Sequence, residues 1–203
     1  MPAWLPRPLL LLVLVAFVAI RMVYERGWRR DEREGRHDRR EHLLTVGVAL
    51  SQAVPALVWI SSDVLAAADL PLPAALRWLG ALLSVAGIGL FVWIHATLGA
   101  NFSPRLDMRA DHTLVTAGPY HFVRHPMYTT NVLLILGYAL LSANAVLLLV
   151  PGLMITVLLV VRLPDEEAMM RDRFGEEWRR WAAGTGRLLP RLRPPASSGP
   201  HAS

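Results

Sequence analysis

The stretch MYTTNVLLILGYALLSANAVLLLVPGLMITVLLVVRL, residues 127–163, decides the fold class of this chain. It contains two apolar runs, Met127–Leu141 and Ala145–Leu163, separated only by Ser142–Asn144. The second run has 19 residues, close to the roughly 20 that carry a helix across a bilayer. The first run has 15 residues, and the short connection predicts a tight helical hairpin.

Three further apolar runs precede this hairpin: Pro8–Tyr24, Leu43–Ser61 and Ala74–Leu98. Hydrophobic residues make up 54% of the chain and the mean hydropathy is +0.37, both high for a water-soluble domain of this size. The first run resembles a signal peptide in length, but it has no small-x-small cleavage site and arginines crowd its far side. We therefore expect an all-α, multi-pass membrane protein with about five transmembrane helices.

The arginines gather in alternate connections between these runs. There are seven in Glu25–His42, none in Ser62–Pro73, three in Gly99–Pro126 and seven after Leu163. Because basic residues accumulate on the cytoplasmic side of membranes, this pattern predicts an outside N-terminus and a cytoplasmic C-terminus.

The charged residues also indicate which partners to expect. The net charge is +5 and every basic residue is arginine, a weak sign of a GC-rich bacterial genome and hence of a bacterial cytoplasmic membrane. The arginines form no stripe with interleaved aromatics, so the predicted partner is the lipid bilayer and not nucleic acid. The chain has no cysteine, which excludes disulfides, thiolate metal sites and cysteine nucleophiles.

The loop AGPYHFVRHPMYTT, residues 117–130, joins the third apolar run to the hairpin. Gly118-Pro119 is a turn signal, and Pro126 suits the first position of a helix. One reading places Arg124 against lipid phosphate and Tyr120 in an interfacial aromatic belt. His121 is four residues before His125, but prolines bracket the pair and no H-E-x-x-H motif is present, so we expect no metal.

A second polar segment, RLPDEEAMMRDRFGEEWRRW, follows the last apolar run. Pro164 predicts a kink, after which a cytoplasmic amphipathic helix is expected; its apolar stripe comprises Met170, Phe174, Trp178 and Trp181. Glu166 falls on this stripe and needs a partner, either Arg162 or a bound cation. Glu167 is placed for a surface ion pair with Arg171.

Together, DHTLVTAGPYHFVRHPMY, the hairpin and the FGEEW segment resemble the isoprenylcysteine carboxyl methyltransferase family over roughly residues 90–181. They are also similar to phospholipid N-methyltransferases. The resemblance implies an integral membrane enzyme that uses S-adenosylmethionine to methylate a carboxylate, isoprenylcysteine-like or otherwise lipophilic, at the membrane.

The resemblance also implies roles for individual residues. Arg162 would orient a substrate carboxylate. Apart from the resemblance, an amine acceptor would need a base, and Glu167 or His121 is the candidate catalytic residue for that step. The implied cofactor contacts are His112, Thr113, Leu114, Val115, Tyr120, His125, Pro126, Met127, Tyr128 and Glu166. The expected organisation is an N-terminal membrane region (1–75), a methyltransferase core (76–190) and a disordered tail (191–203).

Several alternatives remain open. The acceptor could be an aminophospholipid or a small thiol. The chain could be a sterol-type membrane reductase that binds NADPH, with Arg105 and Arg109 near a phosphate, or a non-catalytic membrane scaffold. The chain departs from the family in having Trp178 and Trp181 where tyrosines are usual.

Overall fold

The structure is a computed structural model that describes residues 1–29, 39–99 and 113–191. Helices and their connections make up these ranges, with two isolated β-bridges, Asp69 to Asn144 and Val123 to Gly186. The helices are α1 (Pro6–Arg29), α2 (Arg39–Ser61), η1 (Ala66–Ala68), α3 (Ala74–Leu98), η3 (Gly118–His121), α4 (Pro126–Ser142), α5 (Val146–Val161) and α6 (Leu163–Gly184). Residues 192–203 of the expected tail lie outside the described residues, as do Arg105, Arg109 and His112.

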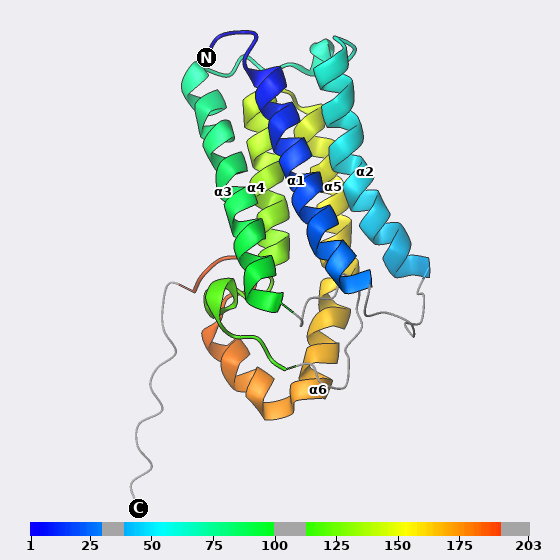
Figure 1. Ribbon diagram of the computed structural model, residues 1–203, viewed down its shortest axis with the longest axis vertical. Coiled ribbons are helices and arrows are strands. Elements are labelled where there is room, and N and C mark those ends of the chain that lie inside the picture. Colours follow the sequence, from blue (N-terminus) through cyan, green and yellow to red (C-terminus); the bar gives the residue numbers. More distant parts are fainter. Residues whose placement is uncertain (30–38, 100–112, 192–203) are drawn as a thin grey trace, which may run out of the picture.

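Helices α1 to α5 run side by side as a bundle, and α6 lies beyond one end of it (Figure 1). Within the described residues, four helical stretches are long and apolar enough to cross a membrane: Pro6–Tyr24, His42–Ser61, Ala74–Leu98 and the stretch from Val146 that includes α5. Helix α4 has 17 residues, so it spans about 26 Å at the usual rise of an α-helix. The all-α, multi-pass membrane architecture expected from the sequence is confirmed.

Helices α3 and α4 approach closely because glycines face each other between them. A Cβ atom added to Gly80 would lie 2.4 Å from the backbone nitrogen of Leu141. One added to Gly137 would lie 2.4 Å from Oγ of Ser84, whose hydroxyl donates to the Gly80 carbonyl over 2.9 Å. Small residues that admit the neighbouring backbone are a common basis for helix association in membranes.

The α4–α5 turn is held to the connection between α2 and α3. Ala143 adopts the left-handed conformation, with φ of 54°, and ends α4. The buried Asn144 side chain donates to the Leu65 carbonyl over 2.8 Å and to Oδ1 of Asp69 over 2.7 Å. Its own oxygen accepts the backbone N–H of Val146 over 3.0 Å, which caps α5. The predicted hairpin therefore forms, and its turn lies at the end of the bundle away from α6 (Figure 1).

The chain changes direction twice after α5. Helix α5 ends at Val161 and α6 begins at Leu163, with Pro164 in its first turn, as the sequence predicts. A second break, which the sequence analysis did not anticipate, occurs at Gly175, where φ is 52°. Glycine permits this conformation without a steric penalty. The expected single apolar stripe is thus divided between two helical segments, and the second returns toward η3 (Figure 1).

Candidate active site at the end of the helical bundle

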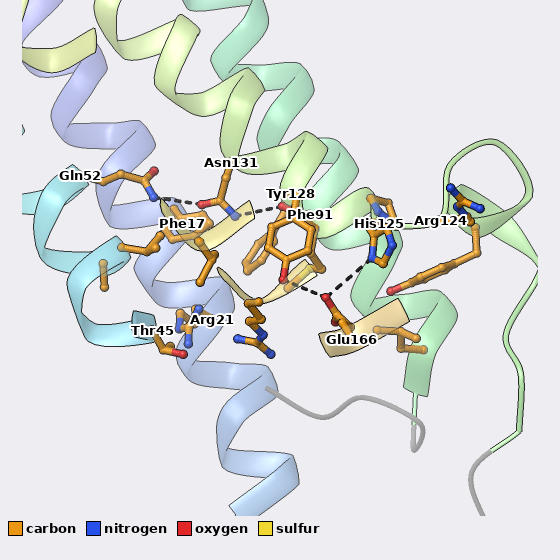
Figure 2. Close-up of a pocket in the computed structure, with 18 residues that line it drawn as sticks. Phe17, Arg21, Thr45, Gln52, Phe91, Arg124, His125, Tyr128, Asn131 and Glu166 are labelled. Atoms are coloured by element: carbon orange, nitrogen blue, oxygen red, sulfur yellow. Dashed lines mark hydrogen bonds and ion pairs between the residues drawn. The ribbon is translucent and has the colours of Figure 1, made fainter. Parts of the chain in front are cut away.

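A cavity of about 200 Å³ lies at the end of the bundle nearest α6. Helices α1, α2, α3 and α4 supply its walls, and the junction of α5 with α6 closes another side. Figure 2 shows the side chains around it. They are Phe17, Arg21, Thr45, Val48, Ala49, Gln52, Phe91, Leu98, Tyr120, Arg124, His125, Pro126, Met127, Tyr128, Asn131, Leu158, Arg162 and Glu166.

Glu166 and His125 face each other at one side of this cavity. The Tyr128 hydroxyl donates to Oε2 of Glu166 over 2.8 Å (Figure 2). The same carboxylate oxygen lies 3.7 Å from Nδ1 of His125, beyond hydrogen-bond distance. Pro126 begins α4 immediately after His125, so this ring is placed at a helix start.

The other nitrogen of the His125 ring contacts Glu167. Nε2 lies 3.2 Å from Oε1 of Glu167. Burial lowers the pKa of His125 below its ordinary value, although Glu166 and Glu167 oppose that shift. His125 is therefore a neutral imidazole with one proton at neutral pH.

Glu167 lies in a cluster of cationic and polar groups. Arg187 donates to it through Nε, over 3.0 Å to Oε1, and through a terminal nitrogen to Oε2. Arg124 approaches Oε1 at 3.3 Å. Burial alone would raise the pKa of Glu167, but hydrogen bonds from Arg187 and His125 and the charge of Arg124 bring it below its ordinary value. Glu167 is thus an ionised carboxylate within a buried network.

These contacts correct the expected environment of the two acids. The Glu167 side chain is 7% exposed, against 27% for Glu166. Glu167 is therefore the more buried acid, and it pairs with Arg187 where the sequence predicted a surface pair with Arg171. Tertiary structure explains this difference, because the segment that follows α6 returns and covers the face of α6 that carries Glu167. The Arg171 guanidinium instead lies 5.7 Å from the Trp178 ring centroid.

The structure brings together most of the residues to which the resemblance gave roles. Tyr120, His125, Pro126, Met127, Tyr128, Arg162 and Glu166 all line the cavity. Thr113, Leu114 and Val115 lie on the described segment leading to η3 and are not part of the lining. Glu167 is also absent from the lining, but it contacts two residues that belong to the lining, His125 and Arg124.

Sequence reasoning missed the residues that α1 and α2 contribute. Arg21 and Thr45 line the cavity, and Gln52 of α2 donates to Oδ1 of Asn131 over 3.0 Å (Figure 2). Asn131 in turn donates to the Met127 carbonyl over 2.9 Å. The available signal was the presence of polar side chains inside apolar runs, where they mark function or mutual pairing.

The two tryptophans at the family's tyrosine positions bind the same loop. The Arg124 guanidinium lies 5.9 Å from the centroid of the buried Trp178 ring, within range of a cation–π contact. Nε1 of Trp181 donates to the Tyr120 carbonyl over 3.3 Å. Indole rings thus hold the loop to the second half of α6 through a stacked cation and a donated hydrogen bond.

Comparisons with known proteins agree with this arrangement. Over 84 residues the chain is 32% identical to the cobalt-zinc-cadmium resistance protein CzcN of Cupriavidus metallidurans, covering 41% of this chain and 38% of that protein. The fold matches the solved structure of a eukaryotic intramembrane Ras methyltransferase, ICMT, with a TM-score of 0.52 and 22% identity. That match covers 77% of this chain and 54% of the solved chain. The chain therefore spans little more than half of one relative and less of the other.

The family model for isoprenylcysteine carboxyl methyltransferases matches residues 79–172. This segment contains most of α3, the loop with His125, the α4–α5 hairpin and the first part of α6. It therefore includes Tyr128, Arg162 and Glu166 of the cavity. The resemblance stated from the sequence is confirmed over residues 79–172, the segment that matches the model of the isoprenylcysteine carboxyl methyltransferase family.

Proposed function

We propose that this chain is an integral membrane methyltransferase that uses S-adenosylmethionine and methylates an anionic, lipophilic acceptor. The observation that carries the proposal is the Glu166 carboxylate facing the His125 ring at the cavity, with Oε2 and Nδ1 3.7 Å apart. A carboxylate oxygen and a ring nitrogen at this distance favour a ligand that places an N–H or O–H donor between them.

The methyl donor has groups that match this side of the cavity. Glu166 and His125 would accept hydrogen bonds from its ammonium group, and an ammonium bound to a carboxylate forms a strong, charge-assisted bond. Phe91 and Tyr128 line the same cavity and can stabilise a sulfonium by cation–π contact. When bound, S-adenosylmethionine supplies an electrophilic methyl group.

The acceptor class follows from the cationic residues around the cavity. Arg21 and Arg162 both line it, and a guanidinium binds a carboxylate through two parallel hydrogen bonds. A carboxylate attacks a methyl group without first losing a proton, so the chain's task is to position it and exclude water. Glu167 is held by Arg187 and His125 and does not line the cavity, so the proposal gives it no proton-transfer role.

The orientation of the chain is part of the proposal. The arginine-rich connections between apolar runs support a cytoplasmic location for α6 and the cavity end of the bundle. S-adenosylmethionine is made in the cytoplasm, so this orientation would give the cavity access to it, while lipophilic acceptors would arrive from the bilayer. An integral membrane location in a bacterial cytoplasmic membrane is consistent with the all-arginine composition.

Calorimetric binding of S-adenosylhomocysteine to the detergent-purified protein tests the proposal directly. We expect binding to the wild type and a loss of roughly ten- to one-hundred-fold in affinity for Glu166→Gln, the value of one charge-assisted hydrogen bond. Glu177→Gln is the matched control, because Glu177 is an exposed residue of the same helix. Its affinity should equal that of the wild type.

NADPH titrated in parallel distinguishes the rival class. Binding of NADPH without binding of S-adenosylhomocysteine would replace the proposal by a reductase, and binding of neither would favour a scaffold. If S-adenosylhomocysteine binds, radiolabelled methyl transfer to an N-acylated isoprenylcysteine, compared with an aminophospholipid and a small alkyl thiol, identifies the acceptor. Transfer only to the aminophospholipid would contradict the anionic acceptor class.

A further inference from the structure

The segment Thr185–Leu189, here called the strap, runs beside the loop that contains His125. The backbone N–H of Arg124 donates to the Gly186 carbonyl over 2.7 Å, and that of His125 donates to the Arg187 carbonyl over 3.0 Å. The Thr129 hydroxyl donates to the Leu188 carbonyl over 2.7 Å. The strap therefore binds the loop on both sides of Pro126, although it lies outside the segment that matches the family model.

The side chain of Arg187 extends this attachment to Glu167. Its guanidinium binds both carboxylate oxygens, the bidentate arrangement that defines direction as well as distance. The same Oε1 atom of Glu167 that accepts from Nε of Arg187 lies 3.2 Å from Nε2 of His125. A continuous path of hydrogen bonds thus links the strap to the ring at the cavity.

This path determines where the His125 proton resides. An ionised carboxylate only accepts hydrogen bonds, so the contact with Glu167 requires the proton on Nε2. A neutral ring then carries a lone pair on Nδ1, the atom that faces Glu166 and the cavity. A carboxylate that accepts a hydrogen bond from one ring nitrogen of a histidine fixes the proton there, and the other nitrogen of the neutral ring is then an acceptor.

We propose that Glu167 and Arg187 are positioning residues that hold His125 in the Nε2–H tautomer, leaving Nδ1 to accept a hydrogen bond from the ammonium group of the methyl donor. The identity of this ligand rests on the proposed function, whereas the tautomer does not. Neither Glu167 nor Arg187 lines the cavity. Glu167 contacts two residues that do, His125 and Arg124, and it acts on the His125 proton through Nε2 of that ring.

The proposal predicts how pH affects ligand binding. His125 faces Glu166 and Glu167 from α6, Arg124 from its own loop and Tyr128 from α4, and the charge of Arg187 reaches it through Glu167. Protonation of Nδ1 removes the acceptor and creates a cation that repels an ammonium. Affinity for S-adenosylhomocysteine should therefore fall as the pH decreases through the pKa of His125.

The decrease in affinity at acidic pH is here called the acid limb of the binding curve. Two variants should move this limb in opposite directions along the pH axis. Glu167→Gln removes a negative charge that stabilises the imidazolium, so the pKa of His125 decreases and the limb shifts to lower pH. Arg187→Ala removes a positive charge and leaves Glu167 less neutralised, so the limb shifts to higher pH. Both variants should also weaken binding at neutral pH by roughly three- to ten-fold, because the ring is held less well. Arg187→Lys keeps the charge and should leave the limb near its wild-type position.

The experiment is calorimetry of S-adenosylhomocysteine from acidic to neutral pH on the wild type, these variants, His125→Gln and the control His121→Gln, where His121 is exposed. A merely structural role would lower the melting temperature of both variants without opposite shifts of the limb. Unchanged limbs, shifts in the same direction, or a wild-type limb that persists in His125→Gln would each overturn the proposal.

A readout without ligand keeps the two proposals separable. Nitrogen-15 NMR of the histidine-labelled, ligand-free protein, with the His125 signal identified by its loss in His125→Gln, should show a neutral ring protonated at Nε2. A wild-type ring protonated at Nδ1, or an imidazolium at neutral pH, would overturn the inference even if S-adenosylhomocysteine binds. Failure of S-adenosylhomocysteine to bind would instead remove the proposed function and leave the tautomer assignment to NMR.

Discussion

The Tyr128 hydroxyl donates a 2.8 Å hydrogen bond to Oε2 of Glu166 and so joins the first turn of α4 to the first turn of α6 across the cavity. In the proposed function, Glu166 binds the ammonium group of the methyl donor. The orientation of its carboxylate therefore depends on a residue of α4, which precedes α6 by the whole α4–α5 hairpin.

Removal of this hydroxyl should weaken binding without disturbing the fold. We expect Tyr128→Phe to lower the affinity for S-adenosylhomocysteine by roughly three- to ten-fold, the value of one positioned hydrogen bond. Tyr138→Phe is the matched control, because Tyr138 lies on the same helix and its buried hydroxyl has no hydrogen-bond partner in the described part of the chain. That change should leave affinity unaltered and the melting temperature equal or higher, since an unpaired buried hydroxyl is unfavourable. The reverse ranking in calorimetry would contradict the assigned role of Tyr128.

The close approach of α3 and α4 can be tested through its glycines. Gly80→Ala should destabilise the protein by about 1–3 kcal/mol, the usual cost of inserting a methyl group into a packed contact. The added Cβ would lie 2.4 Å from the Leu141 nitrogen, whereas one at Gly89 would meet nothing within 4 Å. Thermal unfolding in detergent should therefore show a lower melting temperature for Gly80→Ala and none of this loss for Gly89→Ala. Equal melting temperatures would indicate that the helices separate at no cost.

Arg162 should separate cofactor binding from turnover. We expect Arg162→Ala to keep the affinity for S-adenosylhomocysteine within about two-fold of the wild type, while methyl transfer to a carboxylate acceptor decreases by roughly ten-fold or more because a charge-assisted contact to the acceptor is lost. Arg173→Ala, an exposed position on α6, provides the control. Calorimetry combined with radiolabel transfer measures both quantities. Loss of cofactor affinity in Arg162→Ala would assign this arginine to the donor.

The expected orientation can be tested cleanly because the chain has no cysteine. Asp63→Cys, between α2 and η1, should react with a membrane-impermeant maleimide in intact cells. Glu176→Cys, exposed in α6, should react only after the membrane is permeabilised. The physical reason is the concentration of arginine at the α6 end of the bundle. The opposite labelling pattern would invert the orientation and place the cavity outside.

The site was predictable to the extent that the resemblance to a known family assigns roles to its residues. Tyr120, the run from His125 to Tyr128, Arg162 and Glu166 were all expected, and all line one cavity. Arg187 was not expected, because nothing in the order of residues shows that a segment beyond α6 returns to Glu167. The break at Gly175 has the same origin: an isolated glycine within a helical pattern is usually tolerated, and only the packing of the second segment shows that this one changes the chain's direction.

The sequence by itself determined the helices, their number and their membrane-spanning character, because these depend on local composition and on the bilayer's demand for long apolar segments. It also determined the α4–α5 hairpin, since three residues allow little else. The tertiary structure decided which acid faces the cavity. Glu166 and Glu167 are neighbours with the same chemistry, and local pattern placed the buried face at Glu166. Only the strap, which brings Arg187 to Glu167, buries the second acid in an ion network and leaves the first to the cavity.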